Sequence, residues 1–527
     1  MRSLFIALGL FLGLCFVYIT AMLSKTECFF TYTLDDAYIH LAMAKNFALH
    51  GIWGMTQYAF SSSSSSPIFT FLLGAIIYTF GDNELIPLVF NIFCSVFVIY
   101  FLNKYYSQYF NKSKNIVFAV LFTLFFAVLH LQIMEGMEHV LQVLIIVINI
   151  YCFQKLMNSG DRNLSNTFWF YFTIALMGLI RFESMFYFVS LAFTLMLIRN
   201  LKEALLTLVF GFAPILVFGY FNYQEVGYFF PNSVVVKGTQ FDLTGNYFSQ
   251  IKFLLFDKIF FNVTFYKVGL FPLIITFIFI FRDYRKKLSF RDLVSNNLLL
   301  IVWTSTLILH SLFGNFRGFF RYEAYVLTAF AMVLIPRLKG FFESPVEAFR
   351  KDKIMGVLIF CNTLLFIYKL GFAHLMIVNG STNMYEQQVQ SARFLKKYYN
   401  NSKVVANDIG AVCYFTDIHL FDIAGLGSKE MIPFNEKGKS FDDKFETFLI
   451  KYTLENDYEL AIVYEEWFAG HVPKDWGKVA VLKINNNTNA AIDHVTIYSI
   501  NPKIHKELKE NVKKFNWNKN VQIHIID

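Results

Sequence analysis

Two adjacent acidic residues, Asp35 and Asp36, are the groups in this chain best suited to chemistry. They follow the first long apolar segment by about a dozen residues, in a chain that carries little charge elsewhere. Neighbouring carboxylates repel each other, which can raise the pKa of one of them toward the range useful for proton abstraction. They could also bind a divalent cation such as Mg²⁺ or Mn²⁺ through oxygen. The alternative is a purely structural role at the start of a helix, with Asp35 as the cap and Asp36 in the first turn.

The rest of the chain indicates the setting of these acids. The 527 residues are 56% hydrophobic, 19% aromatic and only 16% charged, with a mean hydropathy of +0.46. Soluble domains usually carry about 25% charged residues. We therefore expect a polytopic α-helical membrane protein. The net charge is +8, but the basic residues cluster beside apolar runs, so nucleic-acid binding is a poor explanation for it.

Eleven apolar runs are expected to cross the membrane. The first, Leu4 to about Leu23, reads as a retained helix rather than a cleaved signal peptide, with Arg2 holding its start in the cytoplasm. The expected spans are 4–23, 85–102, 115–131, 138–156, 166–180, 184–198, 202–221, 264–281, 296–313, 321–337 and 354–378.

One further apolar stretch, 68–80, is short for a span. If it does not cross, the strongly basic loops all fall on the side of Arg2, as the positive-inside rule requires. We therefore expect 68–80 to be a re-entrant or surface-lying helix on the outer face, and the C-terminus to lie outside. This topology gathers the polar loops 24–84 and 222–263 and several shorter polar turns on the outer face, where they would form one polar cavity.

Acidic and basic residues in these turns are the further candidates, and each has a structural alternative. Glu138 lies in the turn Glu135-Gly136-Met137-Glu138-His139. It is either a supporting acid or metal contact near Asp35 and Asp36, or a residue favoured by a helix dipole. Arg181 and Glu183 interrupt two apolar runs, where ionisable groups are costly and are usually functional or paired in a structural ion pair.

Three basic residues suit an anion. Lys237 is a good partner for phosphate, although a solvated lysine is the simpler interpretation. Arg317 and Arg321, followed by Tyr322 and Glu323, fit binding of a phosphate or pyrophosphate, or else are charges flanking an aromatic belt. The histidines, His40 among them, show no metal-ligand spacing, and most read as interfacial or core residues.

From about Ser381 the composition changes and predicts a soluble α/β domain over 381–527, after a membrane domain over 1–380. Strands are expected at Val404–Ala406, Leu460–Tyr464, Val479–Leu482, Val495–Ile500 and Val521–Ile526, and helices at Glu386–Tyr399 and Phe441–Tyr452. The run Ser61–Ser66 is of low complexity and reads as a flexible loop. The six cysteines show no metal-ligand spacing.

Several of these segments resemble, in order, a pattern of bacterial GT-C-type membrane glycosyltransferases, among them uncharacterised enzymes similar to mycobacterial arabinofuranosyltransferases. The resembling segments are Leu34-Asp35-Asp36-Ala37-Tyr38-Ile39 with Ala44-Lys45-Asn46, Ser65-Ser66-Pro67, Glu135-Gly136-Met137-Glu138, Ile180-Arg181-Phe182-Glu183, Phe230-Pro231-Asn232-Ser233 with Lys237, and Asp408-Ile409-Gly410-Ala411 with Asp422-Ile423-Ala424-Gly425-Leu426. Phe182 stands where the pattern has proline, Glu135 where it has serine, and a serine run replaces a turn of mixed sequence.

The resemblance implies a GT-C fold and an inverting transferase of the bacterial inner membrane, with its site and C-terminal domain outside the cytoplasm. The donor would be a polyprenyl-phosphate sugar, and the acceptor a glycan, lipid or protein of the cell envelope. Asp35 or Asp36 would be the base, which the sequence does not separate, and a divalent metal stays open. The residues implied for the donor phosphate are Lys237, Arg181, Arg317 and Arg321, and the supporting residues are Glu138, Glu183 and His40.

Two other functions fit parts of the sequence. A transporter or flippase of an anionic lipid-linked glycan would use the same cationic cavity, but no internal repeat is visible and a large external α/β domain is unusual for one. A non-catalytic scaffold for envelope assembly would leave the adjacent acids without a purpose.

Overall fold

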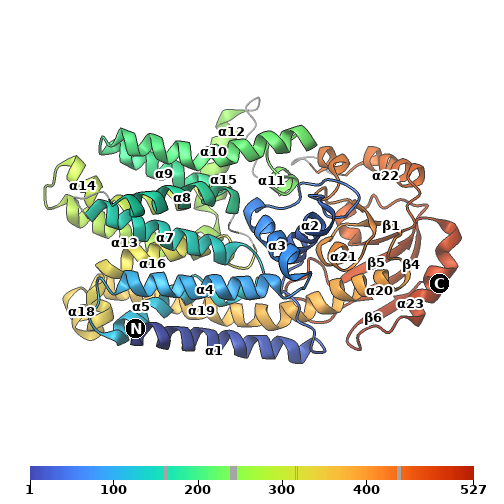
Figure 1. Cartoon of the computed structure of the whole chain (residues 1–527), viewed down its shortest axis with the longest axis horizontal. Coiled ribbons are helices and arrows are strands. Elements are labelled where there is room, and N and C mark those ends of the chain that lie inside the picture. Colours follow the sequence, from blue (N-terminus) through green and yellow to red (C-terminus); the bar gives the residue numbers. More distant parts are fainter. Residues whose placement is uncertain (159–162, 238–245, 315, 317, 436–440, 527) are drawn as a thin grey trace.

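A computed structural model describes the chain except residues 159–162, 238–245, 315, 317, 436–440 and 527. Long apolar helices run side by side through one part of the molecule, and a mixed sheet with its own helices forms the other part (Figure 1). The segments α2 (Asp36–His50), α3 (Pro67–Phe80) and α11 (Asn232–Lys237) lie where the two parts meet (Figure 1).

Within the part of the chain that the structure describes, six helices are long and apolar enough to cross a membrane. An α-helix rises about 1.5 Å per residue, so about 20 apolar residues cover the hydrocarbon core. These helices are α1 (Arg2–Lys25), α4 (Ile86–Tyr106), α7 (His139–Asn158), α10 (Leu201–Val226), α13 (Val263–Tyr284) and α19 (Lys353–Met384). The protein is thus a multi-pass membrane protein, as its composition predicts.

Two bent helix pairs raise the number of spans to eight if each pair counts as one. They are α5 (Ser113–Phe126) with α6 (Leu129–Glu135), bent by 49°, and α14 (Phe290–Asn296) with α15 (Leu298–Phe313), bent by 74°. Shorter apolar helices are α3, α8 (Leu164–Ile180), α9 (Ser184–Leu197) and α16 (Ala324–Arg337). All eleven expected spans fall on a helix or a bent pair, but the number of crossings and their sidedness stay predictions.

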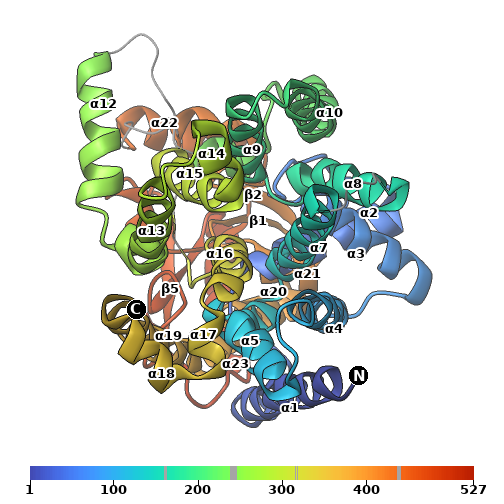
Figure 2. The ribbon, with the colours of Figure 1, turned by 90° about the vertical axis from the view of Figure 1, so that its left-hand side faces the viewer.

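Short helices complete the helical part, namely α12 (Tyr247–Leu255), the π-helix η1 (Phe256–Phe260), α17 (Lys339–Glu343) and α18 (Pro345–Lys351). Figure 2, which looks along the helices, shows α12 at the edge of the bundle.

The membrane part and the sheet part are joined by one long helix. Helix α19 continues through the π-helical turn η2 (Tyr385–Val389) into α20 (Gln390–Tyr398), giving a helix of 46 residues. The expected boundary at 380/381 therefore falls inside a helix, because a change of composition marks where the helix becomes polar and not where the chain breaks. Within η2, Gln387 and Gln388 are buried against Tyr464.

The described residues form a sheet of six strands in the order β2-β1-β3-β5-β4-β6. β1 pairs parallel with β2 and β3, and the other pairs are antiparallel. The strands are β1 (Lys403–Ala406), β2 (His419–Asp422), β3 (Leu460–Val463), β4 (Gly477–Lys483), β5 (His494–Ser499) and β6 (Gln522–Ile525). Five of them lie where the sequence predicts strands, and β2 is the one it missed.

Successive residues of a strand point to opposite faces of its sheet. Both faces of this sheet are apolar, and helices cover each of them. Val404 faces α20 and α23 (His505–Lys514), whereas Val405 faces α22 (Asp443–Glu455). Helix α21 (Gly410–Phe415) follows β1 and packs against α2, so it brings the sheet part to the paired acids. Three short 3₁₀ turns lie among these elements: η3 (Lys429–Phe434), η4 (Glu465–Phe468) and η5 (Pro502–Ile504).

Candidate active site

A cavity of about 740 Å³ lies at the junction of the two parts. Its wall comes from α2, the turn between α8 and α9, α11, the segment before α16, and Leu426 of the sheet part. The predicted gathering of polar segments is therefore seen. The site residues from the sequence analysis that line the cavity are Asp36, His40, Arg181, Glu183, Lys237 and Arg321.

Asp36 is the first residue of α2, and its carboxylate faces two cations. Nη1 of Arg321 lies 2.8 Å from its Oδ2, and Nζ of Lys237 lies 3.8 Å from its Oδ1. Burial opposes ionisation, but Lys237 and Arg321 outweigh it and hold the pKa of Asp36 below its ordinary value. The side chain is thus an ionised carboxylate at the cavity wall.

Asp35 does not line the cavity. Its carboxylate accepts hydrogen bonds from the backbone N–H groups of Gly410 at 2.5 Å and Ala411 at 2.8 Å, at the start of α21. The first N–H groups of a helix have no partner within the helix, so a carboxylate there is a cap. Asp35 holds the N-cap position of α2 without a capping bond and instead caps a helix of the sheet part.

Asp408 completes the surroundings of Asp35. Burial and the neighbouring charge of Asp35 raise the pKa of Asp408 well above its ordinary value. Its Oδ2 also lies 2.7 Å from Nε2 of Gln388 and 3.2 Å from the hydroxyl of Tyr464. In the sequence, Asp408 lies in a segment of the resemblance, but no local pattern indicates that it belongs to the site.

A second group of charges surrounds Arg181. Its Nη1 donates to Glu138 at 2.7 Å and to Ser65 at 3.2 Å, and it pairs with Glu183. Glu138 is fully buried and also lies 3.2 Å from Nε2 of His40. The ion pair expected as the structural alternative for Arg181 and Glu183 is present, yet it lies in the cavity wall.

Tyr322 joins the two groups of charges. Its ring lies 4.8 Å from the guanidinium carbon of Arg181 and 5.1 Å from that of Arg321. A cation over an aromatic face is attracted to it, so this ring fixes the spacing of the two guanidinium groups. The sequence placed Tyr322 beside Arg321 but gave no sign that it also reaches Arg181.

The serine run is not the flexible loop that its composition suggested. Ser61 to Ser64 and Ser66 are buried. Ser63 donates to the carbonyl of Leu426 at 2.7 Å, and Ser64 lies 3.2 Å from Nδ1 of His40. The prediction was wrong because small hydroxyl side chains also satisfy backbone groups in tightly packed segments, which composition cannot reveal.

The Leu426 loop is held from both sides. Besides Ser63, Asn232 donates its amide to the Leu426 carbonyl at 3.1 Å. Within the loop, the Asp422 carboxylate accepts N–H groups of Ala424, Leu426 and Gly427 at 2.7–2.8 Å. Burial raises the pKa of Asp422 to about 6. Asn232 and Leu426 belong to two segments of the resemblance that lie far apart in sequence. These segments therefore meet at the Leu426 carbonyl beside the cavity.

The oxygens of Asp35 and Asp36 do not suit a divalent metal. Asp35 accepts two backbone N–H groups, and Asp36 is paired with Arg321 and Lys237. Hard cations require oxygen ligands that are not already facing positive groups. Arg317, the remaining candidate for the donor phosphate, lies outside the described residues.

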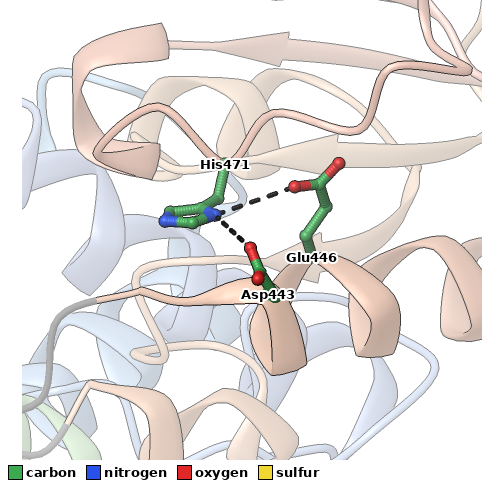
Figure 3. A group of neighbouring side chains, drawn as sticks. All are labelled: Asp443, Glu446 and His471. Carbon is green, nitrogen blue, oxygen red and sulfur yellow. Dashed lines mark ion pairs between the residues drawn. The ribbon is translucent and has the colours of Figure 1, made fainter.

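Among the described residues, one group of three side chains could present metal ligands together: Asp443, Glu446 and His471 (Figure 3). Nδ1 of His471 lies 3.8 Å from Asp443 and 3.7 Å from Glu446. The two acids lie in the first turn of α22, and none of the three lines the cavity. The contacts are those of surface ion pairs, separate from the chemistry of Asp36.

Comparison with known proteins relates this arrangement to a known fold. Residues 382–498 match the family described as Domain of unknown function (DUF8728). The chain has no significant match among curated protein sequences. In structure it is similar to ArnT from Cupriavidus metallidurans bound to undecaprenyl phosphate, with a TM-score of 0.53 and 11% identity over 94% of this chain and 98% of that one.

The apo state of the same ArnT gives a TM-score of 0.52, also at 11% identity and over 94% of this chain and 98% of that one. An Archaeoglobus fulgidus oligosaccharyltransferase in complex with Zn and sulfate gives 0.49 at 12% identity, over 98% of this chain and 80% of that one. The similarity to ArnT confirms the GT-C fold implied by the sequence resemblance.

Proposed function

We propose that this protein is a membrane glycosyltransferase that moves a sugar from a polyprenyl-phosphate donor to an acceptor hydroxyl, with Asp36 as the general base. The observation that carries the proposal is a carboxylate facing two cations, Lys237 and Arg321, in the wall of one cavity. An inverting transfer needs a base for the acceptor and positive charge for the departing phosphate, and the pairing of Asp36 with Lys237 and Arg321 supports these two roles. The fold shared with ArnT supports the same class of reaction.

In the proposed reaction, Asp36 accepts the proton of the acceptor hydroxyl as that oxygen attacks the anomeric carbon. Lys237 and Arg321 stabilise the phosphate as it leaves, and Arg181 supports it from across Tyr322. Asp36 is favoured over Asp35 because the oxygens of Asp35 bond to Gly410 and Ala411 away from the cavity. We place the reaction on the outer face of a bacterial inner membrane, in assembly of envelope glycan, as the loop charges predict.

Sugar transfer by purified protein from polyprenyl-phosphate sugars tests the proposal. We expect Asp36→Asn to lower the rate by about 10²- to 10⁴-fold, the usual contribution of a general base. Asp443→Asn changes an exposed acid away from the cavity and is the matched control. Full activity of Asp36→Asn would refute the role of the base. Movement of lipid across vesicles without sugar transfer would instead support a transporter.

A further inference from the structure

Asp36 forms ion pairs with Lys237 and Arg321, the two cations that the donor phosphate would need. Arg321 Nη1 lies 2.8 Å from Oδ2 of Asp36, and Lys237 Nζ lies 3.8 Å from Oδ1. Lys237 is about half exposed to the cavity, so its ammonium can also reach a bound anion. A carboxylate and a phosphate in this cavity must therefore share the same two positive groups.

The charges of the cavity wall leave room for one more anion. Among the described residues, Arg181 already pairs with two acids, Glu183 and the buried Glu138. Lys237 and Arg321 are two cations that face one carboxylate, Asp36. The group of Lys237, Arg321 and Asp36 therefore has an excess of one positive charge, which matches the single negative charge of a phosphodiester.

We propose that the donor phosphate competes with Asp36 for Lys237 and Arg321, so that donor binding itself converts Asp36 from an ion-pair partner into a base. This inference rests on the proposed function. Without donor, Asp36 is held as a weakly basic carboxylate. A phosphate drawn to the same cations weakens that ion pair and adds a neighbouring negative charge, and both effects favour proton uptake by Asp36.

The charges balance through the reaction. The acceptor oxygen forms a bond to the anomeric carbon, and its proton goes to Asp36. The bond from that carbon to the phosphate oxygen breaks, and its electron pair stays on the phosphate. Before the step, Asp36 and the phosphodiester each carry one negative charge. Afterwards Asp36 is neutral and the phosphate carries both, so Lys237 and Arg321 face the same total charge throughout.

If the phosphate competes with Asp36, removing the charge of Asp36 changes phosphate affinity in a way that a purely structural role of Asp36 would not. Removing its charge should free the two cations and tighten phosphate binding while lowering the rate of transfer. We expect purified Asp36→Asn to bind undecaprenyl phosphate about five- to tenfold more tightly than the wild type, a difference of the size of one partly exposed ion pair. Asp36→Glu keeps the charge and should not show this gain.

Native mass spectrometry in detergent measures these affinities without any turnover, with Asp443→Asn as the control. Unfolding temperatures of all variants verify that each is folded. Equal or weaker binding by a folded Asp36→Asn would overturn the competition. So would tighter binding by Glu183→Gln in place of Asp36→Asn, because the phosphate would then lie on Arg181.

The outcome separates the two proposals. If the wild type transfers sugar but Asp36→Asn binds no more tightly, the competition fails and the proposed function stands. If Asp36→Asn binds more tightly but the wild type transfers no sugar from any donor, the competition stands and the proposed function fails.

Discussion

Gly410 donates its backbone N–H to the carboxylate of Asp35 at 2.5 Å, which joins the sheet part to the residue before the proposed base. Ala411 donates to the same carboxylate at 2.8 Å, so Asp35 caps α21. Asp36 therefore begins a helix whose start is fixed by groups from the far end of the chain.

Replacing Asp408 tests whether it carries a proton. Asp408→Ala leaves the buried Asp35 carboxylate with only its two backbone donors, Gly410 and Ala411, and leaves Gln388 without its acceptor on Asp408. We expect a loss of about 1–3 kcal/mol in the free energy of unfolding. Asp408→Asn retains an N–H donor for Asp35 and an acceptor for Gln388, so its loss should be smaller. Thermal unfolding in detergent compares the two. Equal losses would mean that Asp408 is not the donor.

The contact between Asp35 and α21 requires glycine at position 410. A Cβ there would lie 2.2 Å from the Asp35 carbonyl oxygen and 2.6 Å from its Oδ2. We expect Gly410→Ala to destabilise the protein by about 1–3 kcal/mol, as overpacking does, and to lower transfer activity with it. Gly371→Ala is the control, because nothing lies within 4 Å of its added Cβ. A fully stable Gly410→Ala would contradict this packing.

The Tyr322 ring should matter for donor affinity through its face and not its hydroxyl. Tyr322→Phe keeps the face toward Arg181 and Arg321, whereas Tyr322→Leu removes it. A cation–π contact contributes about 0.5–2 kcal/mol, so Tyr322→Leu should raise KM for the donor by about two- to thirtyfold. Steady-state kinetics of the two variants provide the measurement, and equal KM values would exclude the role of the ring.

Asp422 gives a pH dependence of defined sign. Burial raises its pKa from 3.8 to about 6 in the folded protein. Between these values the folded state binds a proton that the unfolded chain does not, so the group's contribution to stability rises as pH falls from about 6 to about 4. The full change is about 3 kcal/mol, from about 1.4 kcal/mol per pKa unit.

The variant Asp422→Asn lacks this titration. Unfolding temperatures at pH 7 and near pH 4.5 should therefore show the wild type gaining stability relative to Asp422→Asn at the lower pH. A difference between the two proteins that is independent of pH would show that Asp422 has an ordinary pKa.

The sequence predicted the helical part of the fold well, because a long apolar run in the sequence is enough to identify a membrane helix. Each expected span corresponds to a helix or a bent pair. Five strands were also predicted, since buried strands such as Leu460–Val463 are continuous apolar runs. β2 was missed because its sequence, His-Leu-Phe-Asp, has too few apolar residues to mark a strand.

For the site, the sequence identified which residues gather but not what each one contacts. Asp35 and Asp36 are alike in sequence, and only the tertiary fold turns one toward Gly410 and the other toward Arg321. Contacts between residues far apart in the chain, such as Asp35 with Asp408 and Ser63 with Leu426, leave no local pattern.

The π-helical turn η2 determines how the sheet part is rotated, about the axis of the long helix, relative to the membrane part. A π turn holds one residue more than an α turn, and each residue of an α-helix advances the chain by about 100°. Deleting one residue from Tyr385–Val389 would restore a regular α-helix and rotate α20 and everything after it by that angle. Gln388 would then lose its hydrogen bond to Asp408. The number of residues in η2 thus determines how the sheet part is oriented relative to the membrane helices. A single-residue deletion there would be more damaging than most substitutions.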